Sequence, residues 1–115
     1  MASLDQLMGL PGALAAFEFS DRGELVSHQI DPKSGLDEQF LDLLCHVCVA
    51  NRAIASMQAR GWENLTGGDG FYPVEGFGLI GMDWSAVVKD QYGVVLANHR
   101  ADYQAAFDAL SSTEA

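Results

Sequence analysis

The sequence predicts an α+β domain in which helices cover a five-stranded antiparallel sheet. The elements run in the order helix, two strands, long helix, three strands, helix. The strongest periodic signal, from Leu36 to Arg60, has helical spacing, and the segments on both sides show strand-like apolar patterns bounded by turn residues. Its 115 residues suit one core, so we expect a single domain over residues 1–115.

Composition and charge exclude several classes of protein. With 49% hydrophobic and 19% charged residues, the chain is of the globular type, and no uninterrupted apolar run approaches the roughly 18 residues of a membrane span. The net charge of −10 would repel phosphate backbones, so we expect no nucleic-acid partner. The first twenty residues contain no Lys or Arg, so a secretory or transit signal is not visible and we expect a cytoplasmic protein.

The first third of the chain predicts a short helix and a hairpin. Ser3, with a Gln three residues later, has the form of a capping box that opens a helix of one to two turns. Apolar residues over Ala13 to Phe19 and again over Leu25 to Ile30 predict two strands. Gly23 between them can take the positive φ of a tight turn.

The stretch from Leu36 to Arg60 predicts the long helix around which the domain is built. Gly61 stands where a C-terminal cap is expected. One apolar seam follows a spacing of four and three residues: Leu36, Phe40, Leu43, Val47, Ala50, Ile54 and Met57. A second apolar set widens the arc: Leu41, Leu44, Cys48 and Ala55.

In a small domain, a helix that is apolar over more than one face must be shielded from water by two different surfaces. The sheet supplies one of them, and self-association is the simplest source of the other. We therefore predict a homodimer, with a different protein as the alternative cover. The predicted dimer interface consists of Phe40, Leu41, Leu44, Cys48 and Ala55.

The last part of the chain predicts an exposed loop, a three-stranded meander and a final helix. The strands are expected at Gly76 to Met82, Ser85 to Lys89 and Gly93 to Ala97. Asn98 can cap the final helix, whose apolar side carries Tyr103, Ala106, Phe107 and Leu110.

Two glycine-rich stretches are discounted as phosphate sites. Residues Gly76 to Gly81 satisfy the G-x-G-x-x-G pattern, but the sequence after them continues as turn and strand where a dinucleotide site requires a helix N-terminus. The loop from Gly67 to Gly70 lacks the Lys-Ser/Thr of a phosphate-binding loop. We expect close packing at the first stretch and a solvated loop at the second.

Cys45, His46 and Cys48 offer the only thiol or metal chemistry that the sequence suggests. On one helix the two thiols share a face while His46 points about 100° away, and His28 and His99 are isolated in other elements. A structural role of reduced, buried thiols is favoured over a redox or sulfur-carrying role, and over a metal site that a symmetric dimer would have to complete.

No Ser/His/acid or Cys/His/acid set has support in the sequence, so we expect a protein that is not an enzyme and needs no cofactor or metal. Four aromatic residues flank the loop regions and are candidates either for contact anchors or for core packing: Trp62, Phe71, Tyr72 and Trp84.

The order of elements and several short motifs resemble the roadblock/LC7 superfamily. They include Pro11-Gly12 before the first strand and Asp21-Arg22-Gly23-Glu24-Leu25 at the hairpin. The resemblance implies the roadblock/LC7 (profilin-like) sandwich, a five-stranded antiparallel sheet flanked by a long central helix and short terminal helices. It also implies dimers that act as platforms or as regulators of small Ras-like GTPases.

Within that superfamily the chain looks most like the small bacterial DUF2173 family. The similar residues are Leu7 to Gly12, Ala50-Asn51, Met57 to Ala59 and Ala101 to Tyr103. This resemblance implies an accessory or scaffold protein, associated with heterodisulfide-reductase-like complexes of sulfur oxidation. Two alternatives stay open: a regulator of a small GTPase, and a sulfur carrier or redox protein that uses Cys45 and Cys48. The glycine-rich insert from Gly67 to Gly70 departs from the roadblock pattern.

Overall fold

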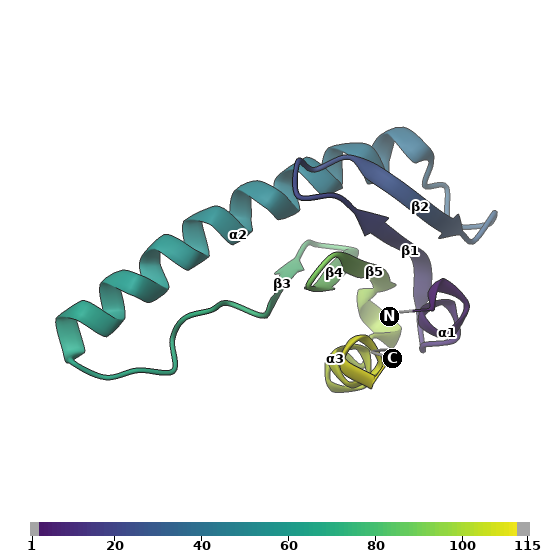
Figure 1. The fold of residues 1–115 in the computed structure, drawn as a ribbon. Helices are drawn as coiled ribbons and strands as arrows, with labels where there is room; N and C mark the ends of the chain where they lie inside the picture. The colour runs from purple at the N-terminus through teal and green to yellow at the C-terminus, as the bar shows by residue number, and fades with distance from the viewer. Residues whose placement is uncertain (1–2, 113–115) are drawn as a thin grey trace.

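The computed structural model describes residues 3–112 (Figure 1). Its elements follow the predicted order: α1 (Leu4–Met8), β1 (Ala13–Phe19), β2 (Leu25–Ile30), α2 (Glu38–Thr66), β3 (Gly76–Ile80), β4 (Trp84–Lys89), β5 (Tyr92–Ala97), a 3-10 turn η1 (Asn98–Arg100) and α3 (Tyr103–Ser112). Ser3 is the N-cap of α1, and its Oγ accepts a hydrogen bond from the Gln6 amide, which is one of the two bonds of the predicted capping box.

The five strands form one antiparallel sheet in the order β2-β1-β5-β4-β3. This confirms the predicted fold class. The middle of the sheet is β5, whose Val94, Val95 and Leu96 are fully buried. Phe17 of β1 lies opposite Gly93 of β5, and the glycine leaves the space that the Phe17 ring occupies.

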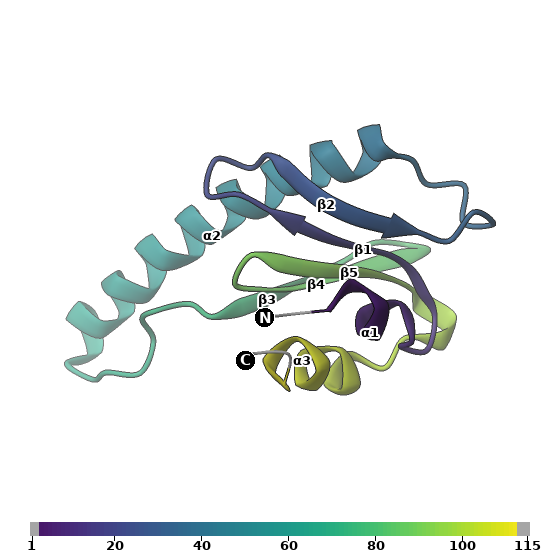
Figure 2. The same cartoon turned by 45° about the vertical axis from the view of Figure 1, so that its right-hand side comes forward.

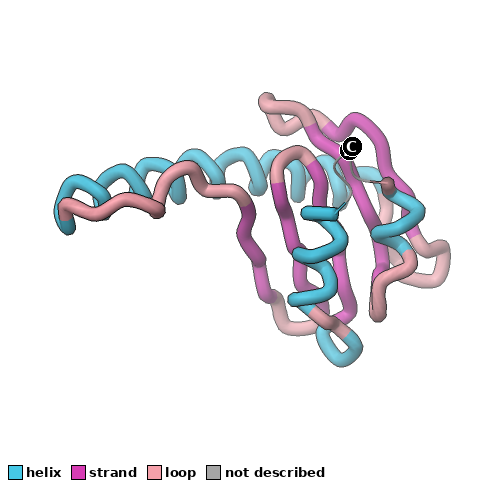
Figure 3. The backbone as a smooth tube through the Cα atoms, turned by 60° about the horizontal axis from the view of Figure 1, so that its bottom comes forward, coloured by secondary structure: helices cyan, strands magenta, loops and turns pink. Residues whose placement is uncertain are grey.

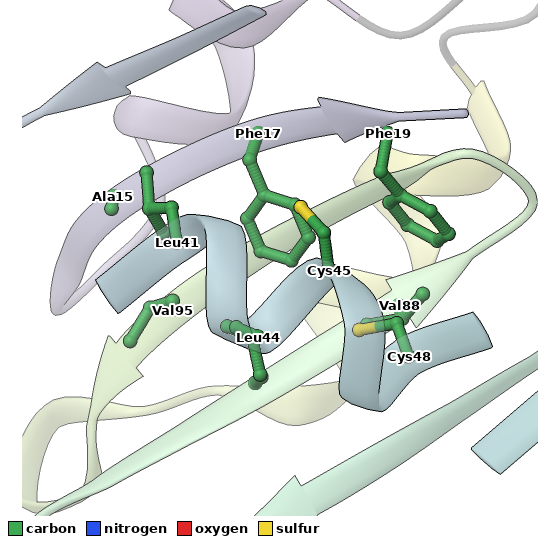
Figure 4. Packing of buried hydrophobic residues seen from close by; sticks show 10 residues of the cluster. Ala15, Phe17, Phe19, Leu41, Leu44, Cys45, Cys48, Val88 and Val95 are labelled. Carbon is green, nitrogen blue, oxygen red and sulfur yellow. The ribbon is translucent and has the colours of Figure 1, made fainter. Parts of the chain in front are cut away.

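Helices cover both faces of the sheet, so the molecule has three layers (Figure 2). On one face, α2 packs onto Phe17, Phe19, Val88 and other apolar strand residues (Figure 4). On the other face, α1 and α3 pack onto a second apolar cluster through residues that include Leu7 and Leu110. Because successive side chains of a strand point to opposite faces of the sheet, the strands contribute to two separate apolar clusters.

The long helix extends beyond its predicted end. It runs through Gly61 to Thr66, and the C-cap is Gly67, which has a φ of 71° and donates its amide hydrogen bond to Glu63 O. Gly61 costs helix propensity, but Trp62 and Leu65 continue the apolar spacing beyond it. The helix ends at Gly67 because the backbone there turns left-handed, a conformation that glycine adopts readily.

The predicted dimer interface on α2 lies mostly in the chain's own core. Leu41, Leu44 and Cys48, expected at a dimer interface, are at most 5% exposed and pack against the chain's own sheet. Phe40 and Ala55 are half-buried. The other seam is the open one, with Leu43 67% and Met57 72% exposed. At about 100° per residue the two sets lie on different faces, and only tertiary packing decides which one meets the sheet.

Residues 53–75, here called the arm, project beyond the sheet (Figure 3). The arm contains the second half of α2 and the loop that returns along it. Arg60 lies over the ring of Tyr72, 4.3 Å from its centroid, and donates a 2.8 Å hydrogen bond to the Tyr72 hydroxyl. Glu63 Oε2 accepts a hydrogen bond from the Tyr72 amide. These contacts hold the returning loop against the helix.

The start of the last helix also differs from the prediction. Asp102 caps α3 by accepting a hydrogen bond from the Ala105 amide at 3.0 Å. Asn98 instead begins η1, and its side-chain amide donates to Gly81 O. The buried Ser85 hydroxyl donates to Asn98 Oδ1 at 2.5 Å. Asn98 therefore joins the β3–β4 turn to the chain segment before α3.

By length and composition α2 is also apolar enough to cross a membrane, although its apolar residues do not form one uninterrupted run. In this structure it is a covering helix of the sheet, with Leu41, Cys45 and Cys48 fully buried against strand residues. Transfer of α2 into lipid would expose the apolar face of the sheet that it covers.

Candidate interaction surface

The outer seam of α2 is an exposed apolar feature of the described residues. It consists of Leu43, Val47, Ile54, Met57 and Leu65, each between 42% and 78% exposed. Their spacing of three, four and seven residues or more places them along one side of the helix. No charged residue of α2 interrupts this seam, so it is a continuous apolar strip of the kind that marks a protein contact.

Two apolar hollows open beside the outer seam. The base pocket, of about 170 Å³, lies where α2 meets the sheet and is lined by Phe40, Leu43, Leu44, Val47, Leu79 and Trp84. Two of its lining residues, Phe40 and Trp84, have rings that meet edge to face with centroids 5.0 Å apart. The arm groove, of about 320 Å³, is lined by Gln58, Gly61, Trp62 and Leu65.

The edge strand β3 borders the same side of the molecule. It pairs with β4 alone, so its outer backbone groups have no strand beyond them among residues 3–112. Leu79 of β3 lines the base pocket, and Ile80 and Met82 are 73% and 97% exposed. An open strand edge beside an apolar helix strip favours association with another folded chain.

The four flanking aromatic residues divide between the two roles that the sequence left open. Trp84 packs in the core cluster beside α2. Trp62, Phe71 and Tyr72 belong to the arm and are 40% to 52% exposed. Large exposed aromatic side chains on a braced segment are suited to act as contact anchors.

The two thiols are buried, as the sequence predicts. Cys45 and Cys48 have no exposed surface and are not linked to each other. Burial raises the pKa of Cys45 to about 12, with Cys48 and Asp42 adding to the effect. Burial also raises the pKa of Cys48 to about 11, although Arg52 opposes the shift. Both side chains are therefore protonated, weakly nucleophilic members of the core.

The histidines do not join the thiols. The exposed His46 ring donates from Nδ1 to Asp42 O on its own helix, at 2.8 Å. His28 and His99 are exposed on β2 and η1. Within residues 3–112 no group of three or more His, Cys, Asp or Glu side chains is arranged to hold a metal ion.

The glycine-rich stretches lie where the sequence places them. Gly76 to Ile80 is strand β3, and a Cβ on Gly76 would lie against Val88 O of the neighbouring strand. This is the close packing expected for the G-x-G-x-x-G stretch. Gly67 to Gly70 forms the exposed tip of the arm.

The apolar pattern of the sequence contains most of the outer seam but does not show its role, and neither Leu65 nor the arm groove was predicted. Leu65 continues the spacing of Ile54 and Met57 beyond Gly61. Extending the helical pattern across the glycine would have found it.

Comparisons with known proteins agree with this architecture. Two structures of MglB proteins, one described as having a tetrameric arrangement and one from Thermus thermophilus, superpose with TM-scores of 0.76 and 0.74. Each is 16% identical to the chain, with 96% of this chain and 78% of the other covered. A Roadblock/LC7 domain from Streptomyces avermitilis has a TM-score of 0.72 and 14% identity over 95% of this chain and 85% of its own.

At these identities the solved structures show the fold alone, which is that of the roadblock/LC7 domain. No curated protein matches the chain significantly. The sequence model of one family, described as "Uncharacterized conserved protein (DUF2173)", matches residues 3–112, nearly the whole length. The chain therefore belongs to the DUF2173 family.

Proposed function

We propose that this protein is a non-catalytic homodimer that regulates a small Ras-like GTPase. The observation that carries the proposal is the outer seam of α2, an apolar strip that the chain's own sheet leaves uncovered. The fold of MglB proteins and of a roadblock/LC7 domain supports it, because the resemblance to roadblock proteins implies dimers that act on GTPases.

The chemistry of the described residues favours a binding role. Cys45 and Cys48, the candidates for thiol chemistry, are fully buried and have raised pKa values. A sulfur carrier needs an accessible thiolate that attacks its donor. The association with a sulfur-oxidising heterodisulfide-reductase-like complex stays a prediction from family resemblance, and in such a complex we expect this chain to serve as a scaffold.

Titration with the Ras-like GTPases of the source organism tests the proposal. Each GTPase is loaded with GDP or with a non-hydrolysable GTP analogue, and its affinity for the dimer is measured by calorimetry. We expect one nucleotide state to bind at least about tenfold more tightly, since a regulator must distinguish the two states. GTP hydrolysis or nucleotide exchange should then change when the dimer is added.

Failure to bind any of these GTPases in either state, at concentrations where the protein is dimeric, would refute the regulatory role. Binding to purified subunits of the heterodisulfide-reductase-like complex would then favour the scaffold. Persulfide formed on Cys45 or Cys48 of the native protein would instead establish a sulfur carrier.

A further inference from the structure

Another hollow lies between the returning loop of the arm and α3, the helix on the face of the sheet opposite α2 (Figure 2). This hollow, here called the loop pocket, has a volume of about 670 Å³, which is within the range of about 300–1,000 Å³ typical of small-molecule sites. The loop contributes Phe71, Pro73 and Val74 to its lining, and α3 contributes Phe107 and Ser111. None of its lining residues belongs to the outer seam.

The aromatic surface of the loop pocket depends on Gly76, the first residue of β3. A Cβ at this position would lie 3.2 Å from Cε1 of the Phe107 ring and 2.6 Å from Val88 O. Because the glycine leaves this space empty, the Phe107 ring lies close to the backbone of β3. Phe107 also packs against the apolar cluster beneath α3. The ring therefore offers the pocket an aromatic surface in a defined position.

Lys89, the last residue of β4, supplies the positive charge of the loop pocket. It lies opposite Gly76 in the pairing of β3 with β4, and it comes two residues after Val87 of the cluster beneath α3. Since alternate residues of a strand share a face, the Lys89 side chain leaves the sheet on the α3 side. Its methylene stem can lie along apolar surface there while the ammonium reaches the pocket.

The ammonium of Lys89 has no hydrogen-bond or ion-pair partner within residues 3–112, although the side chain is half-buried. Arg52 and Arg60, by contrast, donate to Asp90 O and to the Tyr72 hydroxyl. With 16 acidic and 6 basic residues in the chain, a lysine has many possible carboxylate partners. A half-buried charge without a partner, beside apolar side chains, favours an anion from outside the chain.

We propose that the loop pocket binds a small organic monocarboxylate with an aromatic or branched apolar body. The carboxylate accepts hydrogen bonds from the Lys89 ammonium and the Ser111 hydroxyl, and the apolar body packs against Phe107 and Val74. Glu75 also lines the pocket, and its carboxylate repels a second negative charge on the ligand. A monoanion is therefore preferred to a dianion. This site goes beyond the proposed GTPase regulation and does not depend on the dimer.

The same loop is held on its other side by the long helix. Arg60 and Glu63 of α2 contact Tyr72 of the loop, and the Asp90 amide donates to Glu75 O at its end. A ligand between the loop and α3 would add contacts that open states of the loop lack. Bound ligand should therefore slow amide hydrogen exchange over residues 70–76.

Titration followed by nuclear magnetic resonance of the isotope-labelled protein tests the site. The probes are two monocarboxylates, phenylacetate and isovalerate, with phenethylamine as a cation of similar shape and phenyl phosphate as a dianion. Both carboxylates should shift the amide signals of residues 70–76, 89 and 107–111 in a saturable way, with a dissociation constant of about 1 mM or less. Phenyl phosphate should bind more weakly than phenylacetate, and phenethylamine should give no saturable shift.

Two lysine variants provide the matched comparison. Lys89→Met keeps the length of the side chain but removes its charge, and should raise the dissociation constant of phenylacetate about tenfold or more. Lys89→Arg keeps the charge and should retain most of the affinity. Lys33→Met removes the charge of the other lysine, which is exposed in the segment before α2, and should leave the constant unchanged.

Three results would overturn the proposal. The first is the absence of a saturable shift with either carboxylate. The second is an equal dissociation constant for the wild type and Lys89→Met, with both proteins folded as judged by their spectra. The third is tighter binding of phenyl phosphate or phenethylamine than of phenylacetate, which would assign the pocket to a different class of ligand.

Discussion

Arg60 of α2 stacks on Tyr72 of the returning loop and also donates a hydrogen bond to its hydroxyl. The two residues close the arm into a braced unit. Beyond this pair lie the Thr66 hydroxyl, which accepts from the Gly68 amide, and the Gly67 cap. The glycine-rich insert is therefore a turn at the end of the arm.

Replacing Tyr72 should loosen the arm without unfolding the domain. Tyr72→Ala removes the ring and the acceptor, and an exposed cation–π contact contributes about 0.5–1 kcal/mol. We expect faster amide hydrogen exchange over residues 67–75 and unchanged exchange in the sheet. Tyr72→Phe keeps the ring and should have a smaller effect. Equal exchange in all three proteins would show that the pair does not brace the loop.

A methyl group at Gly93 should destabilise the middle of the sheet. A Cβ there would overlap the Phe17 ring, and overpacking of this kind costs typically about 1–3 kcal/mol. Gly78→Ala is the control, because its Cβ would be 3.8 Å from Ala86 O on the neighbouring strand. Urea unfolding should show a clear loss for Gly93→Ala and little change for Gly78→Ala. The reverse order would contradict the packing described.

Reactivity of the thiols should be low near neutral pH. Because burial raises the pKa values of Cys45 and Cys48 to about 12 and about 11, little thiolate is present at pH 7. Alkylation of the native protein should take hours, whereas the denatured protein should react within minutes. Rapid labelling of the native protein would contradict their burial.

The same shifts predict how stability depends on pH. In the folded state the thiols keep their protons at pH values above their ordinary pKa of 9.0. The contribution of the two thiols to the free energy of unfolding is therefore fully present below pH 9. It is lost as the pH rises toward the folded-state values, because the unfolded state ionises first. Urea unfolding at several pH values should show a steeper alkaline loss for the wild type than for a Cys45→Ala, Cys48→Ala variant. If the stability of both proteins fell equally with rising pH, the raised pKa values of Cys45 and Cys48 would be contradicted.

The sequence predicts the fold well because local patterns agree with one another. The capping residue Ser3, the hairpin glycine Gly23 and the continuous apolar run from Val94 to Leu96 each indicate their element without tertiary information. The end of α2 was missed because a glycine alone does not show whether its backbone is left-handed. Gly61 continues the helix, whereas Gly67 has a φ of 71°.

The surface was predicted only in part. Leu43 and Leu44 are adjacent and equally apolar, so the sequence pattern does not show which of them packs against the sheet. Packing decides this: Leu44 is 5% exposed and Leu43 is 67% exposed. A charge at Leu44 is therefore a test of folding, and a test of association requires a residue of the outer seam.

Sedimentation of one charged variant tests the central claim, that the outer seam of α2 joins two copies of the chain. Ile54→Glu and Val26→Glu change residues of nearly equal exposure, 57% and 58%, and only the first lies on the seam. We expect dimers for the wild type and for Val26→Glu, and folded monomers for Ile54→Glu, because a carboxylate buried without a partner in the contact is strongly unfavourable. Folded dimers of Ile54→Glu with the dissociation constant of the wild type would contradict the account.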